Sequence, residues 1–346
     1  MKTLLKSIML TVGASAIGVM LAATGALAQE FTLKFHQFLP AQAPIPAKVL
    51  VPWMAKIEKE SGGRIKFEHY PSMQLGGKPG ELVDQVVDGV ADIVWTLPGY
   101  TPGRFPRTEV LELPFTMTNA EAASRTFWQL AEKHMFAADF KDMKILGTWT
   151  HGPGLIHSKT PITKIEDLKG VKLRAPTRVT NMMVTALGAT AVGMPIPAVP
   201  EALSKGVIDA TIIPWEVTAS IKSSELVKNH TEFTGASLYT STFIMAMNKG
   251  VYDKMPADLK AVIDANTGEE FSAFAGKTSQ EADAPAREMA VKLGNNIIQL
   301  TPDQVEGWKT AAQSIIETWI AETGKAGFDG KALLDEAKAA MTANTK

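Results

Sequence analysis

The pattern of apolar and polar positions predicts a strand, a helix and a second strand at the start of the mature chain. Residues Phe31–Phe35 alternate between apolar and polar side chains, and so do residues 64–68. A helix is predicted between these strands, from about Pro46 to Lys59, and Ser61-Gly62-Gly63 suits a left-handed C-cap that ends it. This order indicates an α/β layer fold.

One sequence of elements occurs twice in the chain. A predicted helix over residues 80–88 leads through Gly89–Asp92 into the apolar strand Ile93–Trp95. A predicted helix over residues 200–205 leads in the same way, through Gly206–Asp209, into the apolar strand 210–213. Two α/β domains of similar plan explain this repeat, although helix-glycine-strand junctions are also common in any α/β protein. The mature length of about 318 residues fits two domains.

The last third of the chain is predicted to be helical. A helix from Pro256 to about Leu293 would exceed one small domain and would have to lie across two, with a kink or break at Pro285. Thr301-Pro302 begins a further helix. We therefore expect a first domain of residues 29–152 with about 237–275, a second of 153–236 with about 286–325, a spanning helical region at about 257–293, and a C-terminal helix and tail over 326–346.

The N-terminal residues predict export. Lys2 and Lys6 precede the apolar stretch Ile8–Leu21, and Ala26-Leu27-Ala28 has the small-x-small pattern of a cleavage site. The alternative is a membrane anchor, but the apolar stretch is shorter than the roughly 20 residues of a membrane span. We expect a signal peptide of residues 1–28 and a mature protein in the periplasm that is not inserted in the membrane.

Charge and cysteine content exclude several classes of function. Without Lys2 and Lys6, the 35 basic residues fall to 33 against 36 acidic ones, and no basic stripe is visible. This argues against nucleic acid and against an anionic membrane surface as partners. The absence of cysteine excludes disulfides, thiolate metal sites and a cysteine nucleophile.

The chain contains no motif of the catalytic classes we considered. It lacks G-x-S-x-G, the phosphate loop G-x-x-x-x-G-K-[ST], a G-x-G-x-x-G after a strand, and H-E-x-x-H. His151 and His157 are six residues apart, which matches no ordinary zinc motif. No catalytic residue, metal site or cofactor is expected, and a cation that assists ligand binding through Glu216 and neighbouring oxygens is left open.

A single arginine stands out in a strand context. Residues 170–176 alternate and end at Pro176, so that Lys172 and Arg174 share one face if Val171 and Leu173 face the core. In open α/β sheets, ligands lie beyond the carboxyl ends of strands, where the fork of Arg174 suits a carboxylate. A surface salt bridge is the alternative interpretation.

The segment around this arginine resembles the signature strand of the DctP-like solute-binding proteins of TRAP transporters. The resemblance covers nearly the whole mature chain, because other segments match family motifs in order. They are PSMQLGG (71–77), DGVAD (88–92), ELPF (112–115), DLKGVKLRAP (167–176), and Asn248-Lys249 followed by Pro256 and Leu259, where Met255 replaces a leucine of the family pattern.

This resemblance implies two α/β domains joined by hinge strands, a long helix across both, and an interdomain cleft that closes over an organic acid. It also implies delivery of the acid to an ion-driven membrane permease. Arg174 would hold the ligand carboxylate. The other positions that the family pattern implies as ligand contacts are His36, Gln37, Trp95, Thr96, Tyr100, Pro214, Trp215 and Glu216.

Some positions depart from the sialic-acid members of the family. Pro153 stands in place of a second arginine, Ile213 in place of an asparagine, and Ile196 near a phenylalanine that faces the sugar. Leaving a buried hydroxyl unpaired costs about 1–3 kcal/mol, so a sugar acid is disfavoured.

These substitutions favour a monocarboxylate with a flat or apolar body. An aromatic acid is expected, packed among Trp95, Tyr100, Trp215 and Phe243. The alternative ligand is a branched 2-oxo or 2-hydroxy acid, whose second oxygen would bond His36 or His151. An ABC-type binding protein and a periplasmic enzyme on the same scaffold are the competing functions.

Overall fold

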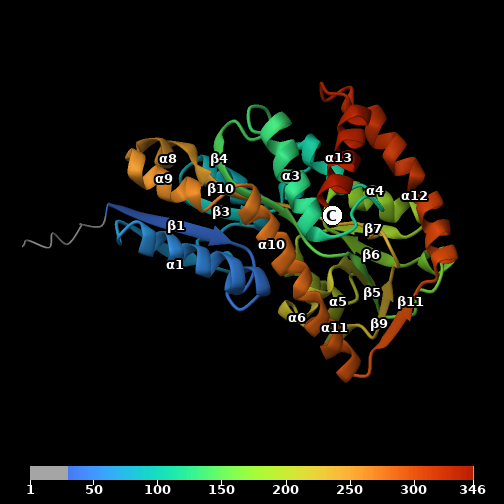
Figure 1. Cartoon of the computed structure of the whole chain (residues 1–346). Helices are drawn as coiled ribbons and strands as arrows, with labels where there is room; N and C mark the ends of the chain where they lie inside the picture. The colour runs from blue at the N-terminus through green and yellow to red at the C-terminus, as the bar shows by residue number, and fades with distance from the viewer. Residues whose placement is uncertain (1–29, 346) are drawn as a thin grey trace, which may run out of the picture.

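The described part of the chain, residues 30–345 of a computed structural model, forms two mixed β-sheets with helices packed around them (Figure 1). The expected signal peptide of residues 1–28 lies outside this part. None of the helices within residues 30–345 combines the length and the hydropathy needed to cross a membrane.

The first sheet has the strand order β2-β1-β3-β10-β4. β1 pairs in parallel with β2 and β3, whereas β10 pairs antiparallel with β3 and β4. A short π-helical turn over Pro46–Leu50 and α1 connect β1 to β2, which confirms the predicted strand-helix-strand start. The elements are β1 (Phe31–Gln37), α1 (Val51–Glu60), β2 (Ile65–Tyr70), α2 (Leu82–Val87), β3 (Ile93–Thr96), α3 (Ala120–His134), β4 (Met143–Thr150) and β10 (Thr242–Asn248).

The second sheet has the strand order β11-β9-β5-β8-β6-β7. β6 lies between β7 and β8 and is parallel to both, so that several strand ends meet at one edge. Its elements are β5 (Leu155–Ser158), β6 (Lys172–Ala175), α4 (Arg178–Ala186), β7 (Thr190–Gly193), α5 (Val199–Ser204), β8 (Ala210–Ile213), α6 (Trp215–Ser220), α7 (Ser223–Leu226), β9 (Asn229–Glu232) and β11 (Asn296–Gln299).

The chain passes from the first sheet to the second between β4 and β5, and it returns between β9 and β10. The expected division between residues 152 and 153 falls in the first of these crossings. The two strands of the predicted repeat, β3 and β8, lie in different sheets, each flanked by a parallel neighbour.

The helical region expected at about 257–293 consists of three helices, α9 (Ala257–Ala265), α10 (Glu269–Glu281) and α11 (Asp283–Lys292). The first break contains Gly268, whose φ of 99° suits glycine. The second break precedes Pro285, which lies in the first turn of α11, where its missing N–H leaves no helical hydrogen bond unmade. α10 packs against α3 and β4, which belong to the layer of the first sheet, and α11 packs against α6, which belongs to the layer of the second. Together the two helices therefore contact both layers (Figure 1).

Three more helices complete the fold: α8 (Lys249–Lys254), α12 (Pro302–Thr323) and α13 (Gly330–Asn344). Thr301 caps α12 as the sequence predicted, because its side chain accepts a hydrogen bond from the backbone N–H of Gln304. α12 packs against α4, and α13 packs against α3. The C-terminal segment therefore covers helices from both parts of the molecule.

Candidate ligand-binding site

A cavity with a water-accessible volume of about 40 Å³ lies where the strand ends of the two sheets meet. The first sheet contributes β3, β10 and residues that follow β1, β3 and β4, and the second contributes β6, the end of β8 and residues that follow β6, β7 and β8. The lining is mostly apolar, as is usual for small-molecule sites. It consists of Phe38, Leu39, Trp95, Leu97, Tyr100, His151, Arg174, Pro176, Ile196, Ile213, Pro214, Glu216, Val217, Tyr239, Ser241 and Phe243.

Arg174 on β6 is the cation of this cavity. Its side chain is 2 % exposed, and the guanidinium donates through Nε to the Met194 carbonyl (2.9 Å) and through Nη1 to the Ile212 carbonyl (3.2 Å). These bonds hold the guanidinium plane in place. Among residues 30–345 no carboxylate forms an ion pair with Arg174, and burial lowers its pKa. A buried guanidinium without a counter-ion is costly, and a bound anion removes that cost.

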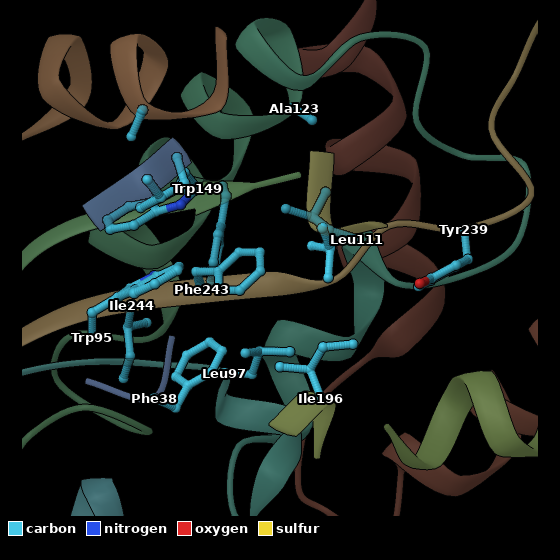
Figure 2. Packing of buried hydrophobic residues seen from close by; sticks show 14 of the residues in the cluster. Phe38, Trp95, Leu97, Leu111, Ala123, Trp149, Ile196, Tyr239, Phe243 and Ile244 are labelled. Atoms are coloured by element: carbon cyan, nitrogen blue, oxygen red, sulfur yellow. The ribbon is translucent and has the colours of Figure 1, made fainter. Parts of the chain in front are cut away.

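Aromatic rings form one wall of the cavity, and Figure 2 shows how Phe38, Trp95, Trp149 and Phe243 pack together. Trp95 of β3 stacks on Phe38 with ring centroids 4.8 Å apart, and it lies 5.5 Å from Phe243 of β10. Trp149 of β4 continues the series behind Phe243, at 6.2 Å. β3, β10 and β4 are hydrogen-bonded neighbours in one sheet, so Trp95, Phe243 and Trp149 lie next to one another and form one apolar surface.

Two tyrosines lie near the guanidinium. The Tyr100 hydroxyl accepts a hydrogen bond from the Ile196 backbone N–H at 3.1 Å. Burial raises the pKa of Tyr100 and of Tyr239, and the Arg174 charge opposes that rise. Both phenols are therefore neutral at neutral pH and available as hydrogen-bond donors near the cation.

His151 is held as a neutral imidazole. Its Nδ1–H donates to the Gly152 carbonyl (2.6 Å), and its Nε2 accepts from the Ser241 backbone N–H (3.0 Å). Burial lowers the pKa of His151 to about 4, and the Arg174 charge adds to this. Since both ring nitrogens already have backbone partners, the imidazole forms part of the cavity wall but offers no free nitrogen to hydrogen-bond a ligand.

Glu216 is the acidic group of the cavity. It is 3 % exposed, and burial, together with the charge of Asp283, raises its pKa to about 8. Burial also raises the pKa of Asp283 to about 7, and Asp283 accepts a hydrogen bond from the Glu216 backbone N–H at 2.8 Å. With a pKa of about 8, the Glu216 carboxyl is mostly protonated at pH 7.

The structure brings most of the predicted site residues together. Seven of them line the cavity, namely Trp95, Tyr100, His151, Arg174, Pro214, Glu216 and Phe243. The departures Ile196 and Ile213 also line it, whereas Pro153 does not. Four predicted residues lie outside the lining: His36, Gln37, Thr96 and Trp215.

Trp215 differs from the expectation because α6 begins directly after Pro214. Successive helical residues point about 100° apart, so Glu216 faces the cavity and Trp215 turns away from it. The indole Nε1 donates to Glu232 at 2.9 Å, and the ring packs against His157 and His230. Trp215 therefore packs within the second sheet's layer.

The three remaining residues bond within the layer of the first sheet. His36 Nδ1 lies 2.6 Å from Gln85 Oε1, and the Gln37 side-chain oxygen accepts from the Leu39 N–H at 2.5 Å. Thr96 alternates with Trp95 along β3, so its hydroxyl points to the other face, 3.5 Å from the Pro79 carbonyl. The cavity wall is instead formed by Phe38 and Leu39, one step beyond the end of β1.

Sequence reasoning missed several lining residues. Phe38 carried a usable signal, because it directly follows a predicted strand end. Tyr239 and Ser241 carried none, since they precede β10 in a segment without periodicity. In the described chain no group of three histidine, aspartate or glutamate side chains is placed to hold a metal ion.

Residues 35–323 match the sequence model of the bacterial extracellular solute-binding proteins, family 7 (DctP). The chain belongs to this family. The resemblance to DctP-like TRAP receptors is thereby confirmed.

Family 7 proteins of known structure show the same fold. A TRAP solute-binding protein from Rhodoferax ferrireducens T118, in complex with copurified benzoate, is 47 % identical, with 91 % of this chain and 98 % of that chain covered and a TM-score of 0.89. A marine metagenome TRAP protein from an unidentified microbe, specific for aromatic acid ligands and solved with 3-hydroxybenzoate, is 45 % identical, with coverages of 92 % and 100 % and a TM-score of 0.90.

A TRAP protein from Bordetella bronchiseptica with bound (R)- and (S)-mandelate is 27 % identical, with coverages of 90 % and 98 % and a TM-score of 0.83. These matches confirm the predicted α/β fold of two domains.

Proposed function

We propose that this chain is a periplasmic receptor that binds an aromatic monocarboxylate in the cavity and delivers it to a TRAP-type permease. The observation that carries the proposal is Arg174, a buried guanidinium that is held by backbone carbonyls and has no ion-pair partner within residues 30–345. A ligand carboxylate supplies the missing counter-charge in a fixed geometry.

The walls favour an aromatic body on that carboxylate. Stacking on a ring such as Trp95 or Phe243 is worth about 0.5–1.5 kcal/mol per good pair. Ile196 and Ile213 offer no partner to hydroxyl groups, and each unpaired hydroxyl costs about 1–3 kcal/mol. Relatives that are 47 % and 45 % identical contain benzoate and 3-hydroxybenzoate, which supports the same ligand class here.

The family and the expected leader support a cellular role for this receptor in transport. Export through residues 1–28 would place the receptor in the periplasm, where TRAP permease subunits are its partner. We further propose that each sheet is the core of one domain, residues 29–152 with about 237–275 and residues 153–236 with about 286–325, and that the two close over the ligand. We expect binding without turnover and without a cofactor.

Thermal unfolding with a panel of acids tests the ligand class. The panel contains benzoate, phenylacetate, mandelate, a branched 2-oxo acid, succinate and galactonate. Calorimetric titration then measures the affinity of each acid. An aromatic acid at 100 times its Kd should add about 2.7 kcal/mol to the unfolding free energy. A larger effect from the branched 2-oxo acid would favour the alternative ligand, and a panel without any stabilising acid would refute carboxylate capture. Chromatography of the released ligand should recover it unchanged.

A further inference from the structure

Glu216 lines the cavity, and its buried carboxyl is only partly satisfied by hydrogen bonds within the described chain. Its Oε1 atom lies 3.5 Å from Ser279 Oγ, at the limit of a hydrogen bond, and its Oε2 atom is buried without a hydrogen-bond partner. No described cation forms an ion pair with this carboxyl. Buried polar atoms normally have partners, so the unpaired oxygen of a residue that lines the cavity is available to a hydrogen-bonding group of the ligand.

The ligand group that best fits this carboxyl is one that both donates and accepts hydrogen bonds. Burial and the neighbouring Asp283 favour the protonated form of Glu216, which has an O–H to donate and a carbonyl oxygen to accept. A ligand hydroxyl satisfies either protonation state, because it can donate to a carboxylate and accept from an acid. A second ligand carboxylate would be repelled whenever Glu216 is ionised.

Glu216 and Arg174 are two separate polar groups in the lining of the cavity. No ion pair joins Arg174 to Glu216, although both line the same cavity. A hydroxyl on an aromatic ring whose carboxylate binds Arg174 can therefore serve as a second contact, at Glu216.

We propose that Glu216 binds a hydroxyl group on the ligand's aromatic ring, so that the receptor selects ring-hydroxylated aromatic acids over the unsubstituted ones. This inference rests on the proposed function, since it places the carboxylate at Arg174. The two most similar structures described above contain one ligand of each kind, benzoate and 3-hydroxybenzoate, so the comparisons by themselves do not decide between them. A site that is built to bond a hydroxyl discriminates strongly against an analogue lacking it.

Calorimetric titration of matched benzoates tests the proposal on the unaltered protein. The series is benzoate, 3-hydroxybenzoate, 4-hydroxybenzoate, 3-methylbenzoate as a control for size, and 3-methoxybenzoate, which accepts but does not donate. One hydroxybenzoate isomer should bind about 10-fold or more tightly than benzoate and than the methyl analogue. A methyl analogue that binds as tightly as the hydroxyl analogue would overturn the proposal, because size alone would then explain the preference.

Two variants assign the preference to Glu216. In Glu216→Leu the ratio of hydroxybenzoate to benzoate affinity should fall to about one, with benzoate gaining affinity, because no carboxyl is left unpaired. In Glu216→Gln the preference should persist, since the amide also donates and accepts. An undiminished ratio in Glu216→Leu refutes the assignment to Glu216. If that variant does not fold, the benzoate series on the unaltered protein still decides whether the receptor prefers a ring hydroxyl.

The outcomes separate this inference from the proposed function. If benzoate binds but no hydroxybenzoate binds better, the role of Glu216 is refuted and aromatic acid capture stands. If no aromatic acid binds, both are refuted. Mandelate against phenylacetate tests the position of the hydroxyl, because a preference for mandelate that disappears in Glu216→Leu would place the recognised hydroxyl beside the carboxylate instead of on the ring.

Discussion

Arg178, at the start of α4, forms a two-point ion pair with Glu109, with Nε–Oε1 and Nη2–Oε2 distances of 2.9 and 2.6 Å. Glu109 belongs to the 3₁₀ turn Pro106–Leu111 and is 6 % exposed, and it also accepts a hydrogen bond from the Trp319 indole of α12 at 3.0 Å. The pair connects this turn to the helix that directly follows the Arg174 strand. It therefore helps to fix the position of α4 beside the cavity.

We expect Arg178→Met to lower the unfolding free energy by about 1–3 kcal/mol, because it leaves a buried carboxylate with only one partner. Chemical denaturation measures this change. The control is Lys205→Met, which removes the exposed pair of Lys205 with Glu201 and should change nothing measurable. Equal effects of the two substitutions would contradict a special role for the Arg178 pair.

Arg174→Met should weaken the binding of the best carboxylate by about 100-fold or more. The loss reflects two hydrogen bonds to a charged group, each worth about 1.5–3 kcal/mol. The melting temperature of the unliganded protein should not fall much, since the substitution replaces an unpaired buried charge with an apolar chain of similar length. Titration calorimetry measures the affinity.

Lys172→Met is the matched control for the arginine. Lys172 lies two residues earlier on β6, and its ammonium bonds the Gly206 carbonyl away from the cavity. Its substitution should leave the affinity unchanged. A comparable loss in both variants would mean that Arg174 acts only through the stability of the strand.

The pH dependence of stability should carry the signature of Glu216. Its pKa is about 8 in the folded protein against 4.5 for the unperturbed carboxyl, so between these values the folded state binds the extra proton. The free energy of unfolding should therefore fall as the pH rises through this window. In Glu216→Gln the fall should be shallower, as followed by denaturation at several pH values. A slope identical to that of the unaltered protein would show that Glu216 is ionised in both states.

Gly276 is required by the close approach of α10 to α3. A Cβ at this position would collide with Ser124 Oγ and with the Ala120 carbonyl oxygen. Gly276→Ala should therefore lower the unfolding free energy by about 1–3 kcal/mol. Gly307→Ala in α12 is the matched control, because its Cβ would meet open space; it should stabilise the protein by about 0.5–1 kcal/mol. Thermal or chemical unfolding of both variants decides.

The local pattern of the sequence determined the elements and much of the site's chemistry. Alternation predicted β1 and β2 together with the helix between them, and the segment around Arg174 predicted a strand that ends at a ligand position. These features depend on residues close together in the chain, so periodicity and turn chemistry are sufficient to find them. The ordered family segments then connected the arginine with a carboxylate.

Tertiary structure decided which neighbours of each strand end face the cavity. Trp215 and Glu216 are adjacent in sequence, and because α6 begins directly after Pro214, Glu216 lines the cavity whereas the Trp215 indole packs against His157 and His230. Likewise, Phe38 reaches the cavity while His36 and Gln37 bond within the first sheet's layer. Arg174 shares the cavity with aromatic rings of the other sheet, Phe38, Trp95 and Phe243, which are far from it in the sequence, so no local pattern records this arrangement.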